Sequence, residues 1–236
     1  MSKIQEFLRY NRQTMLSEIG DSGQEKLKKA KVLVIGAGGL GCPVLQYIST
    51  AGVGTIGIVD FDKIEMHNLH RQILYTEKQV GLSKALTAKE RLEKLNPLID
   101  IIAFDEKLTF ENATQIIQKF DVVLDGCDNF ETRYLVNDTC VALGKTLVYG
   151  SILKYQGQMA IFNHNGSKNL RHLFPEPPNS SDVPNCNLNG VIGTLPGIIG
   201  TMMGHETLKL IIDLPVLKNE LVLFDTLYWD FRKLKF

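Results

Sequence analysis

The chain has 236 residues with equal numbers of acidic and basic side chains, 26 of each, and so carries no formal net charge. This balance argues against a protein whose main task is to coat nucleic acid or an anionic membrane. Its apolar fraction of 44% is ordinary for a globular protein, and its length suits one large domain or two small ones.

The cysteines and the first residues bear on metal content and location. The four cysteines, Cys42, Cys127, Cys140 and Cys186, form no CxxC pair, so a thiol-rich structural zinc site is not predicted. A disulfide framework is not expected in a chain of this length and helical pattern. The polar start shows no signal peptide, and a cytoplasmic, reducing location is expected.

The first part of the chain predicts a helical arm followed by a strand–helix–strand unit. Residues 1–30 are polar and helical in pattern. Residues 31–35 form a short apolar run that predicts a buried parallel strand, and a helix is expected from about Leu40. A second strand follows at 55–60, so the glycines between the strands lie where a dinucleotide-binding fingerprint requires them.

Strands and helices continue to alternate as far as about residue 150. We expect helices at 83–95, 110–119 and 131–143 and strands at 99–104, 122–125 and 146–150. This alternation predicts an α/β protein with a Rossmann-like, doubly wound, mostly parallel sheet and helices on both faces.

The pattern changes after residue 150. Strands at 157–162 and 220–225 and a closing strand within 227–236 are expected to be antiparallel, and no linker divides the single domain 1–236. The irregular segment 163–189 is expected to be mobile. Pro196 interrupts the glycine-rich helix predicted at 190–212, whose uncharged part is too short for a membrane span, so we expect it to be buried or to face a second subunit.

A glycine loop at residues 36–41 is the first candidate for binding chemistry. Gly36, Gly38 and Gly41 form a GxGxxG pattern, whose backbone N–H groups can approach a phosphate. Asp60 ends the next strand, where a carboxylate can hold ribose hydroxyls. These residues alone fit an NAD enzyme and an ATP enzyme equally, and a tight turn with a surface Asp is the structural alternative.

Two cations favour a triphosphate. Arg71, within the polar run Asn68-Leu69-His70-Arg71-Gln72, can bridge two phosphate oxygens, and Lys84 can neutralise a third. An NAD-binding oxidoreductase would leave both cations without a role. For either cation taken singly, a solvated surface position is the alternative.

Asp128 completes the candidate site. It follows the strand at 122–125, at the edge of the sheet where open α/β sheets bind ligands, and its carboxylate could hold Mg²⁺ on phosphates. Asn129 could hydrogen-bond there, and either Asp128 or Asn129 could instead cap the helix that follows. Cys186, within the irregular segment, is either an exposed nucleophile or an inert loop cysteine.

These residues together resemble the MoeB/ThiF family, bacterial relatives of ubiquitin-activating enzymes. The matching motifs are Arg9-Tyr10-Asn11-Arg12-Gln13, Val34-Ile35-Gly36-Ala37-Gly38-Gly39-Leu40-Gly41, Val59-Asp60-Phe61-Asp62, Asn68-Leu69-His70-Arg71-Gln72, Gly81-Leu82-Ser83-Lys84, Asp125-Gly126-Cys127-Asp128-Asn129-Phe130 and Pro184-Asn185-Cys186. The resemblance covers nearly the whole chain.

The resemblance implies an activity and a set of site residues. The implied activity is ATP-dependent adenylylation of the C-terminal Gly-Gly carboxylate of a small ubiquitin-like sulfur-carrier protein, for thiamine or molybdopterin synthesis. The implied nucleotide site comprises Gly36, Gly38, Gly39, Gly41, Asp60, Asp62, Asn68, Arg71, Gln72, Lys84, Asp128 and Asn129, with Mg²⁺ on Asp128. Arg12 would reach the γ-phosphate from the other subunit of a homodimer, and Cys186 would be the position of a covalent link.

One departure from the family pattern changes the metal expectation. Many members hold zinc with two CxxC pairs, whereas this chain has Asn169-Leu170-Arg171-His172 at the place of the first pair and no second pair. We therefore expect no structural zinc, and a separate protein as sulfur donor. The alternatives are a related enzyme that activates a peptide C-terminus or tRNA, and an inactive interaction scaffold.

Overall fold

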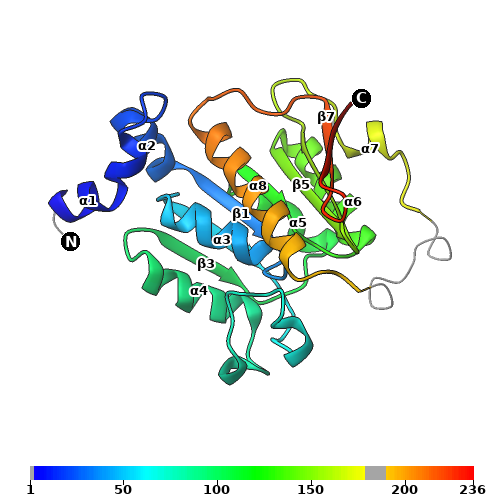
Figure 1. The fold of residues 1–236 in the computed structure, drawn as a ribbon, viewed down its shortest axis with the longest axis horizontal. Coiled ribbons are helices and arrows are strands. Elements are labelled where there is room, and N and C mark those ends of the chain that lie inside the picture. Colours follow the sequence, from blue (N-terminus) through cyan, green and yellow to red (C-terminus); the bar gives the residue numbers. More distant parts are fainter. Residues whose placement is uncertain (1–2, 179–189) are drawn as a thin grey trace.

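The computed structural model describes residues 3–178 and 190–236, which build one eight-stranded sheet in the order β3-β2-β1-β4-β5-β6-β7-β8 (Figure 1). The strands are β1 (Lys31–Ile35), β2 (Thr55–Val59), β3 (Asp100–Phe104), β4 (Val122–Asp125), β5 (Thr146–Leu153), β6 (Gln156–Phe162), β7 (Glu220–Asp225) and β8 (Asp230–Lys235). The pairings among β1 to β5 are parallel, and those from β5 to β8 are antiparallel. The predicted parallel half that continues into antiparallel strands is confirmed.

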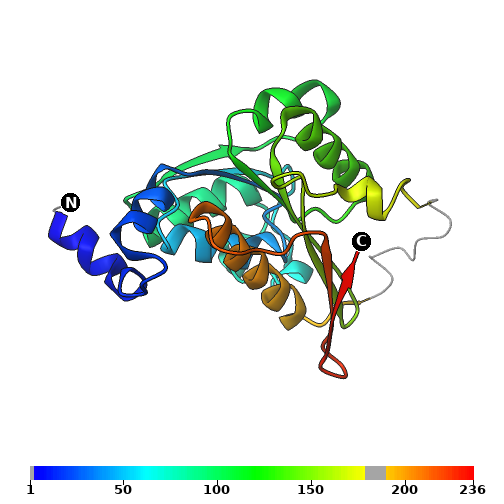
Figure 2. The same cartoon turned by 90° about the horizontal axis from the view of Figure 1, so that it is seen from above.

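Helices cover both faces of the sheet (Figure 2). They are α1 (Lys3–Thr14), α2 (Gly20–Lys29), α3 (Gly41–Thr50), α4 (Lys84–Leu95), α5 (Phe110–Ile117), α6 (Phe130–Leu143), α7 (Leu170–Leu173) and α8 (Thr194–Ile211), with two short 3₁₀ helices, Met66–Asn68 and Glu77–Gln79. Alternate strand residues pack into two apolar cores, one against α2, α3, α4 and α8 and the other against α5, α6 and α7. This arrangement confirms the predicted doubly wound fold.

The two largest differences from the predicted element boundaries both come from strand pairing, and the other boundaries agree to within about two residues. β5 continues to Leu153 because its end forms a hairpin with β6, with Leu153 opposite Gln156. The helix predicted from residue 190 begins only at Thr194, since Val191 forms a parallel bridge with Lys154 at that hairpin turn.

The segment predicted to be irregular contains helix α7. Asn169 caps this helix by accepting a hydrogen bond from the Arg171 N–H (3.0 Å), and Leu170 N donates to the buried Asn137 side chain of α6 (3.0 Å). The Asn169 cap and the hydrogen bond to the buried Asn137 amide therefore stabilise the helix at residues 169–173. Residues 179–189, including Cys186, lie outside the described residues, and the expected mobility of 163–189 stays a prediction.

The N-terminal arm protrudes from one side of the molecule (Figure 2) and contacts segments that precede β2 and β3, at the amino ends of the parallel strands. The Asn96 side chain donates to Tyr10 Oη (2.9 Å), and Gln13 Nε2 donates to the carbonyl of Ala51, just after α3 (2.8 Å). Since α3 begins at the glycine loop and has ten residues, its far end lies about 15 Å from that loop. In residues 3–178 and 190–236, no helix combines the length and apolar character of a membrane span.

Candidate active site

Three loops meet where the strand order reverses. β1 lies between β2 and β4, and Ile35 is in register with both Val59 and Asp125, so these strands end at one level. The loops that follow contain the glycines, Asp60 and Asp128, respectively. Open α/β sheets bind ligands at such a switch point, outside the carboxyl ends of the strands.

The glycine loop is folded so tightly that two of its positions exclude a side chain. Gly36 has φ +89°, and a Cβ there would lie 2.9 Å from the carbonyl oxygen of Gly126. A Cβ on Gly41 would lie 1.9 Å from the carbonyl oxygen of Gly36. The loop thus brings the N-terminus of α3, where the helix dipole favours an anion, close to the crevice.

Asp60 holds this loop in shape. Its Oδ2 accepts a hydrogen bond from Ala37 N (2.7 Å), and its Oδ1 accepts one from Asp62 N (2.8 Å). Burial raises the pKa of the Asp60 carboxyl, and nearby Lys84 acts in the opposite direction. Asp60 therefore joins the two loops at the crevice, and its predicted contact with a ribose stays a prediction.

Arg71 is held against the glycine loop by its own segment. Its guanidinium donates to Asn68 Oδ1 (2.9 Å) and to the carbonyl of His67 (3.2 Å). The Arg71 Cδ lies 3.7 Å from the place that a Cβ on Gly39 would occupy. The structure therefore brings Asn68, Arg71 and Gly39 together as the sequence predicts.

Gln72, the next residue, carries an unsatisfied polar atom. Its side chain is buried, and its Oε1 has no hydrogen-bond partner among the described residues. Its Nε2 lies 3.5 Å from the place of a Cβ on Gly38. A buried polar atom normally has a partner, so this orphan beside the glycine loop is consistent with a polar ligand in the crevice.

Lys84 is a buried cation at the first position of α4. Ser83 caps the helix by accepting a hydrogen bond from Leu86 N (3.2 Å), and Lys84 itself is only 5% exposed. Its Nζ lies 2.7 Å from Asp62 Oδ2. A cation at a helix N-terminus opposes the helix dipole, so this position is poor for stability and is typical of a residue kept for binding.

The sequence left open which of Asp128 and Asn129 caps the following helix and which is available for a ligand. Asn129 is the N-cap of α6, since its Oδ1 accepts a hydrogen bond from Thr132 N (2.9 Å). Asp128 is exposed, and no interaction of its carboxylate with another described residue is found. Its carboxylate is therefore accessible to a ligand or a metal ion.

Sequence reasoning missed two residues that hold the site together. The Tyr75 hydroxyl donates to the carbonyl of Ala37 (2.8 Å) and lies 3.2 Å from the carbonyl of Lys84, so it joins the glycine loop to the start of α4. Arg133 forms a buried ion pair with Asp125. Asp125 ends an apolar strand, and a buried carboxylate needs a counter-charge. That requirement is the one signal in the sequence that could have indicated a cationic partner such as Arg133.

Two predicted catalytic residues are not part of this crevice. Arg12 is exposed on α1 at the opposite edge of the sheet, so its own chain does not bring it to the glycine loop. Cys186 lies outside the described residues. Cys42 and Cys140 are buried as predicted, and burial raises the pKa of each to about 12, which keeps these thiols unreactive.

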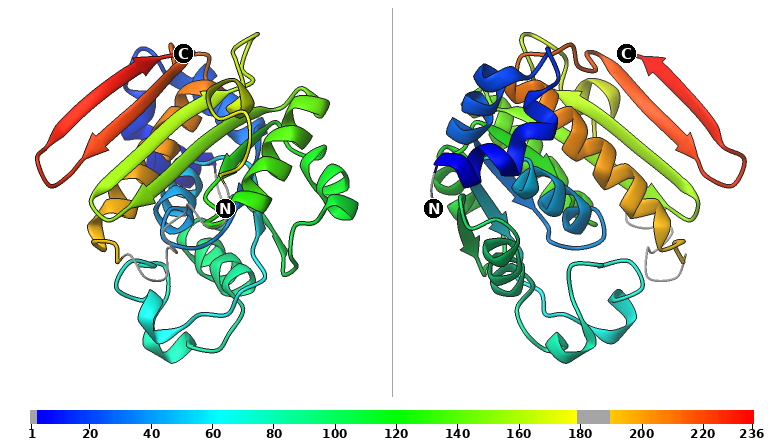
Figure 3. Two further views of the ribbon diagram at one scale, coloured as in Figure 1. Left: turned by 90° about the vertical axis from the view of Figure 1, so that its right-hand side faces the viewer. Right: turned by 60° about the vertical axis from the view of Figure 1, so that its left-hand side comes forward.

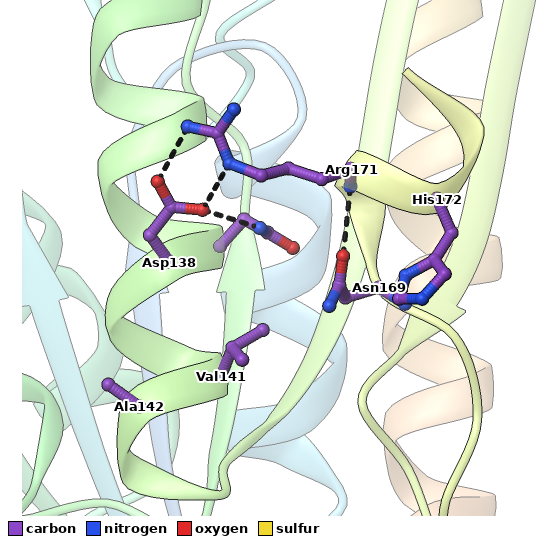
Figure 4. Close-up of a pocket in the computed structure, with 7 residues that line it drawn as sticks. Asp138, Val141, Ala142, Asn169, Arg171 and His172 are labelled. Carbon is purple, nitrogen blue, oxygen red and sulfur yellow. Dashed lines mark hydrogen bonds and ion pairs between the residues drawn. The ribbon is translucent and has the colours of Figure 1, made fainter. Parts of the chain in front are cut away.

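A separate pocket of about 430 Å³ lies between α6 and α7 (Figure 4). Its charged groups are paired with each other: Arg171 donates to both oxygens of Asp138, each at 2.8 Å. His172 and Asn169 lie beside them. In the described part of the chain, no three His, Cys, Asp or Glu residues come together to hold a metal ion, and the expected lack of zinc stays a prediction.

Sequence comparisons identify relatives over nearly the whole chain. The model of the ThiF family matches residues 10–236. A sulfur carrier protein adenylyltransferase of Thermus thermophilus is 49% identical, and the match covers 98% of this chain and 87% of that protein. The adenylyltransferase and sulfurtransferase MOCS3 of Aedes aegypti is also 49% identical over 98% of this chain, which spans only 53% of that relative.

Solved structures share the fold. MccB of Escherichia coli, determined with ATP, has a TM-score of 0.84 and 21% identity, with 96% of this chain and 71% of MccB covered. PaaA has a TM-score of 0.83 and 19% identity, with 100% of this chain and 76% of PaaA covered. At such identities the likeness shows the fold alone, whereas the family model and the much closer sequence relatives show that the chain belongs to the ThiF family.

Proposed function

We propose that this chain uses ATP to adenylylate the C-terminal carboxylate of a small ubiquitin-like sulfur-carrier protein and releases pyrophosphate. Its relatives of 49% identity are named adenylyltransferases, and the Thermus protein is named for a sulfur carrier. The product would be an acyl-adenylate, and a separate protein would then supply sulfur to its acyl carbon as AMP leaves. Thiamine-type and molybdopterin-type carriers both fit this proposal, and a cytoplasmic location agrees with it.

The observation that carries the proposal is the set of groups around the glycine loop. The N-terminus of α3 points to the switch point, the buried Gln72 Oε1 lacks a partner among the described residues, and two cations lie nearby, Arg71 beside Gly39 and Lys84 beside Asp62. Arg71 and Lys84 would reduce the repulsion between the anionic carboxylate and the anionic nucleotide. Asp62, which now pairs with Lys84, would share this cation with the phosphates.

The residues also fit a magnesium ion bound together with the nucleotide. Asp128 offers an exposed carboxylate at the switch point, and Mg²⁺ in nucleotide sites commonly uses one or two carboxylates with phosphate oxygens and water. When bound, the ion supplies positive charge that stabilises the departing pyrophosphate. Asn129, occupied as a helix cap, would contribute mainly by fixing the backbone at Asp128.

The test is ATP–pyrophosphate exchange with purified ThiS-type and MoaD-type carriers that end in Gly-Gly. Exchange that depends on the carrier and on its terminal carboxylate supports the proposal. No exchange with either carrier, from enzyme that binds ATP, would contradict it. Parallel assays with a peptide C-terminus and with tRNA test the alternative substrates, which the sequence relatives do not favour.

We also propose a homodimer in which Arg12 acts in the site of the other copy. Large apolar side chains are exposed on the arm, at Phe7, Leu8, Met15 and Leu16, and also on the segment after β2, at Phe61, Met66, Ile73 and Leu82. In a two-fold dimer, the apolar residues of the arm of one copy could pack on those of the segment after β2 of the other copy. The same contact would bring Arg12 of one copy towards Arg71 of the other. Accordingly, mixed dimers of Arg12→Ala and Asp128→Ala subunits should regain one working site, and lack of any recovered exchange would count against it.

A further inference from the structure

The segment between β2 and α4 leaves the body of the molecule as a long loop and returns to the start of α4 (cyan in Figure 3). Tyr75 lies in this loop, yet it is buried, with 6% of the residue exposed. Its hydroxyl lies 2.8 Å from the carbonyl oxygen of Ala37 in the glycine loop and 3.2 Å from the carbonyl oxygen of Lys84. A hydroxyl carries one proton, so the two carbonyls share one donor, and the nearer Ala37 is its main acceptor. One buried side chain thus bridges the glycine loop and the first residue of α4.

These contacts belong to a closed ring of hydrogen bonds. Asp60 accepts hydrogen bonds from Ala37 N (2.7 Å) and from Asp62 N (2.8 Å). Lys84 donates twice to Asp62, from its backbone N to the carbonyl oxygen (3.0 Å) and from Nζ to Oδ2 (2.7 Å). The Tyr75 hydroxyl closes the ring by joining Lys84 to Ala37. A closed ring fixes the distances between its members better than an open chain of the same contacts, because each member is held from two sides.

The backbone of Tyr75 is attached to the segment that carries Arg71. Tyr75 N donates to the carbonyl of Gln72 (3.1 Å). Gln72 N and Arg71 N both donate to the carbonyl of Asn68, at 2.9 and 3.1 Å. Tyr75 therefore links both cations of the candidate site, Arg71 through its backbone and Lys84 through its side chain, to the glycine loop.

The Tyr75 hydroxyl is placed to act on a bound nucleotide indirectly, because both of its acceptors are backbone carbonyls. Burial raises the pKa of this hydroxyl, so it remains a proton donor over the pH range in which proteins stay folded. Without the hydroxyl, Lys84 keeps its charge and its contact with Asp62, whereas its distance from the glycine loop is free to vary. A cation that is placed beforehand loses less conformational freedom when a phosphate binds, and so it binds the phosphate more tightly.

We propose that Tyr75 is a positioning residue of the nucleotide site, whose hydroxyl fixes Lys84 and the N-terminus of α3 at the separation that the phosphates of ATP require. This inference rests on the proposed function, because it takes the crevice to be an ATP site. Once ATP is bound, its phosphates draw Lys84 towards the glycine loop, so the hydroxyl contributes to ATP affinity more than to later steps. It contributes more for ATP than for AMP, since a cation attracts a triphosphate more strongly than a monophosphate.

The experiment compares Tyr75→Phe with Tyr134→Phe. Tyr134 is equally buried, at 6% exposed, and its hydroxyl also contacts two backbone carbonyls, those of Phe174 (2.9 Å) and Glu176 (2.8 Å). Each variant loses one hydroxyl and keeps its aromatic ring, so both should fold, with similar small decreases in melting temperature. Calorimetry then measures the binding of ATP and of AMP, and ATP–pyrophosphate exchange gives kcat and the KM for ATP and for the carrier.

Tyr75→Phe should weaken ATP binding and raise the KM for ATP roughly tenfold, the effect of one lost hydrogen bond of ordinary strength. AMP binding, kcat and the KM for the carrier should change by less than about twofold, because the lost interaction serves the binding of the triphosphate. Tyr134→Phe should bind ATP as wild type does.

ATP binding equal to that of wild type in Tyr75→Phe would overturn the role of Tyr75. Equal losses of ATP and AMP binding would also overturn it, because the defect would then not concern the additional phosphates. The same is true of a Tyr75→Phe protein that does not fold, or of an equal loss in Tyr134→Phe, since either result would assign the hydroxyl to stability. Wild-type enzyme whose ATP binding depends on Tyr75 but which shows no exchange with either carrier would contradict the proposed function and leave the role of Tyr75 standing.

Discussion

Arg133 and Asp125 form a buried ion pair directly beneath the loop that carries Asp128, with 3.0 Å between Nε and Oδ2. Arg133 also donates to the carbonyls of Cys127 (2.8 Å) and Gly150 (3.0 Å), and Asp125 Oδ1 accepts a hydrogen bond from Cys127 N (3.0 Å). The pair therefore fixes both backbone groups of Cys127, the residue before Asp128. It also joins this loop to β5.

Arg133→Met should destabilise the protein strongly, because the variant leaves the Asp125 carboxylate buried without its counter-charge. The expected loss is about 3–5 kcal/mol in the free energy of unfolding, measured with urea. Arg171→Met is the control, since it breaks the partly exposed pair with Asp138, and it should cost no more than about 1 kcal/mol. Equal losses in the two variants would mean that burial does not increase the contribution of the Arg133–Asp125 pair to the free energy of unfolding.

Arg133→Lys separates the charge of this residue from its geometry. A lysine keeps the positive charge but cannot reach Asp125 and two carbonyls with one planar group. If these contacts position Asp128, exchange should need more Mg²⁺ in this variant, and added Mg²⁺ should restore most of the rate. A purely structural role predicts lower stability with the wild-type Mg²⁺ dependence.

Asp128→Asn tests the assigned magnesium ligand. The amide keeps the shape of the side chain but lacks the negative charge that Mg²⁺ prefers, so exchange should fall by roughly a hundredfold, in line with the loss of several kcal/mol of charge stabilisation. Glu131→Gln is the matched control, because it removes an exposed acid three residues away that pairs only loosely with Lys107 (3.6 Å). An exchange rate equal to that of wild type in Asp128→Asn would show that Asp128 is not a magnesium ligand.

Two alanine substitutions distinguish the structural glycines of the loop from the others. The Cβ of Gly41→Ala would lie 1.9 Å from the Gly36 carbonyl oxygen, whereas that of Gly38→Ala would make an ordinary contact of 3.5 Å with Gln72. Gly41→Ala should therefore lower the melting temperature markedly, whereas Gly38→Ala should keep a melting temperature near that of wild type. Calorimetry and ATP binding check both, and a stable Gly41→Ala protein would show that the loop can relax.

The sequence predicted the sheet and most of the crevice because both depend on local patterns. Apolar runs that end in glycine or aspartate identify parallel strands, and parallel strands that share one edge bring Gly36, Asp60 and Asp128 together. Arg71 and Lys84 were predicted because they follow the glycine loop and the acidic strand end, and the structure places Arg71 beside Gly39 and Lys84 beside Asp62. These inferences need only the order of the strands.

The remaining features depend on contacts between segments that are distant in sequence. The pairing of Arg133 with Gly150, of Tyr75 with Ala37 and of Trp229 with Phe224 follows from tertiary packing, which single-sequence periodicity does not contain. Helix α7 was missed for a different reason. It has four residues, too few for a helical period, and it is stabilised by its cap and by α6.

The contact between α7 and α6 should weaken in acid. Hydrogen bonds from Arg171 hold the pKa of the Asp138 carboxyl below its ordinary value of 3.8. Because the folded pKa is the lower one, the stabilisation is fully present above the unfolded pKa and is lost as the pH falls through the folded pKa. The Arg171 Nε–H signal in NMR spectra should therefore shift or broaden below pH 3.8, before the amide signals of β1 report global unfolding. Asp138→Asn should abolish this transition, and an unchanged transition in that variant would assign it to another group.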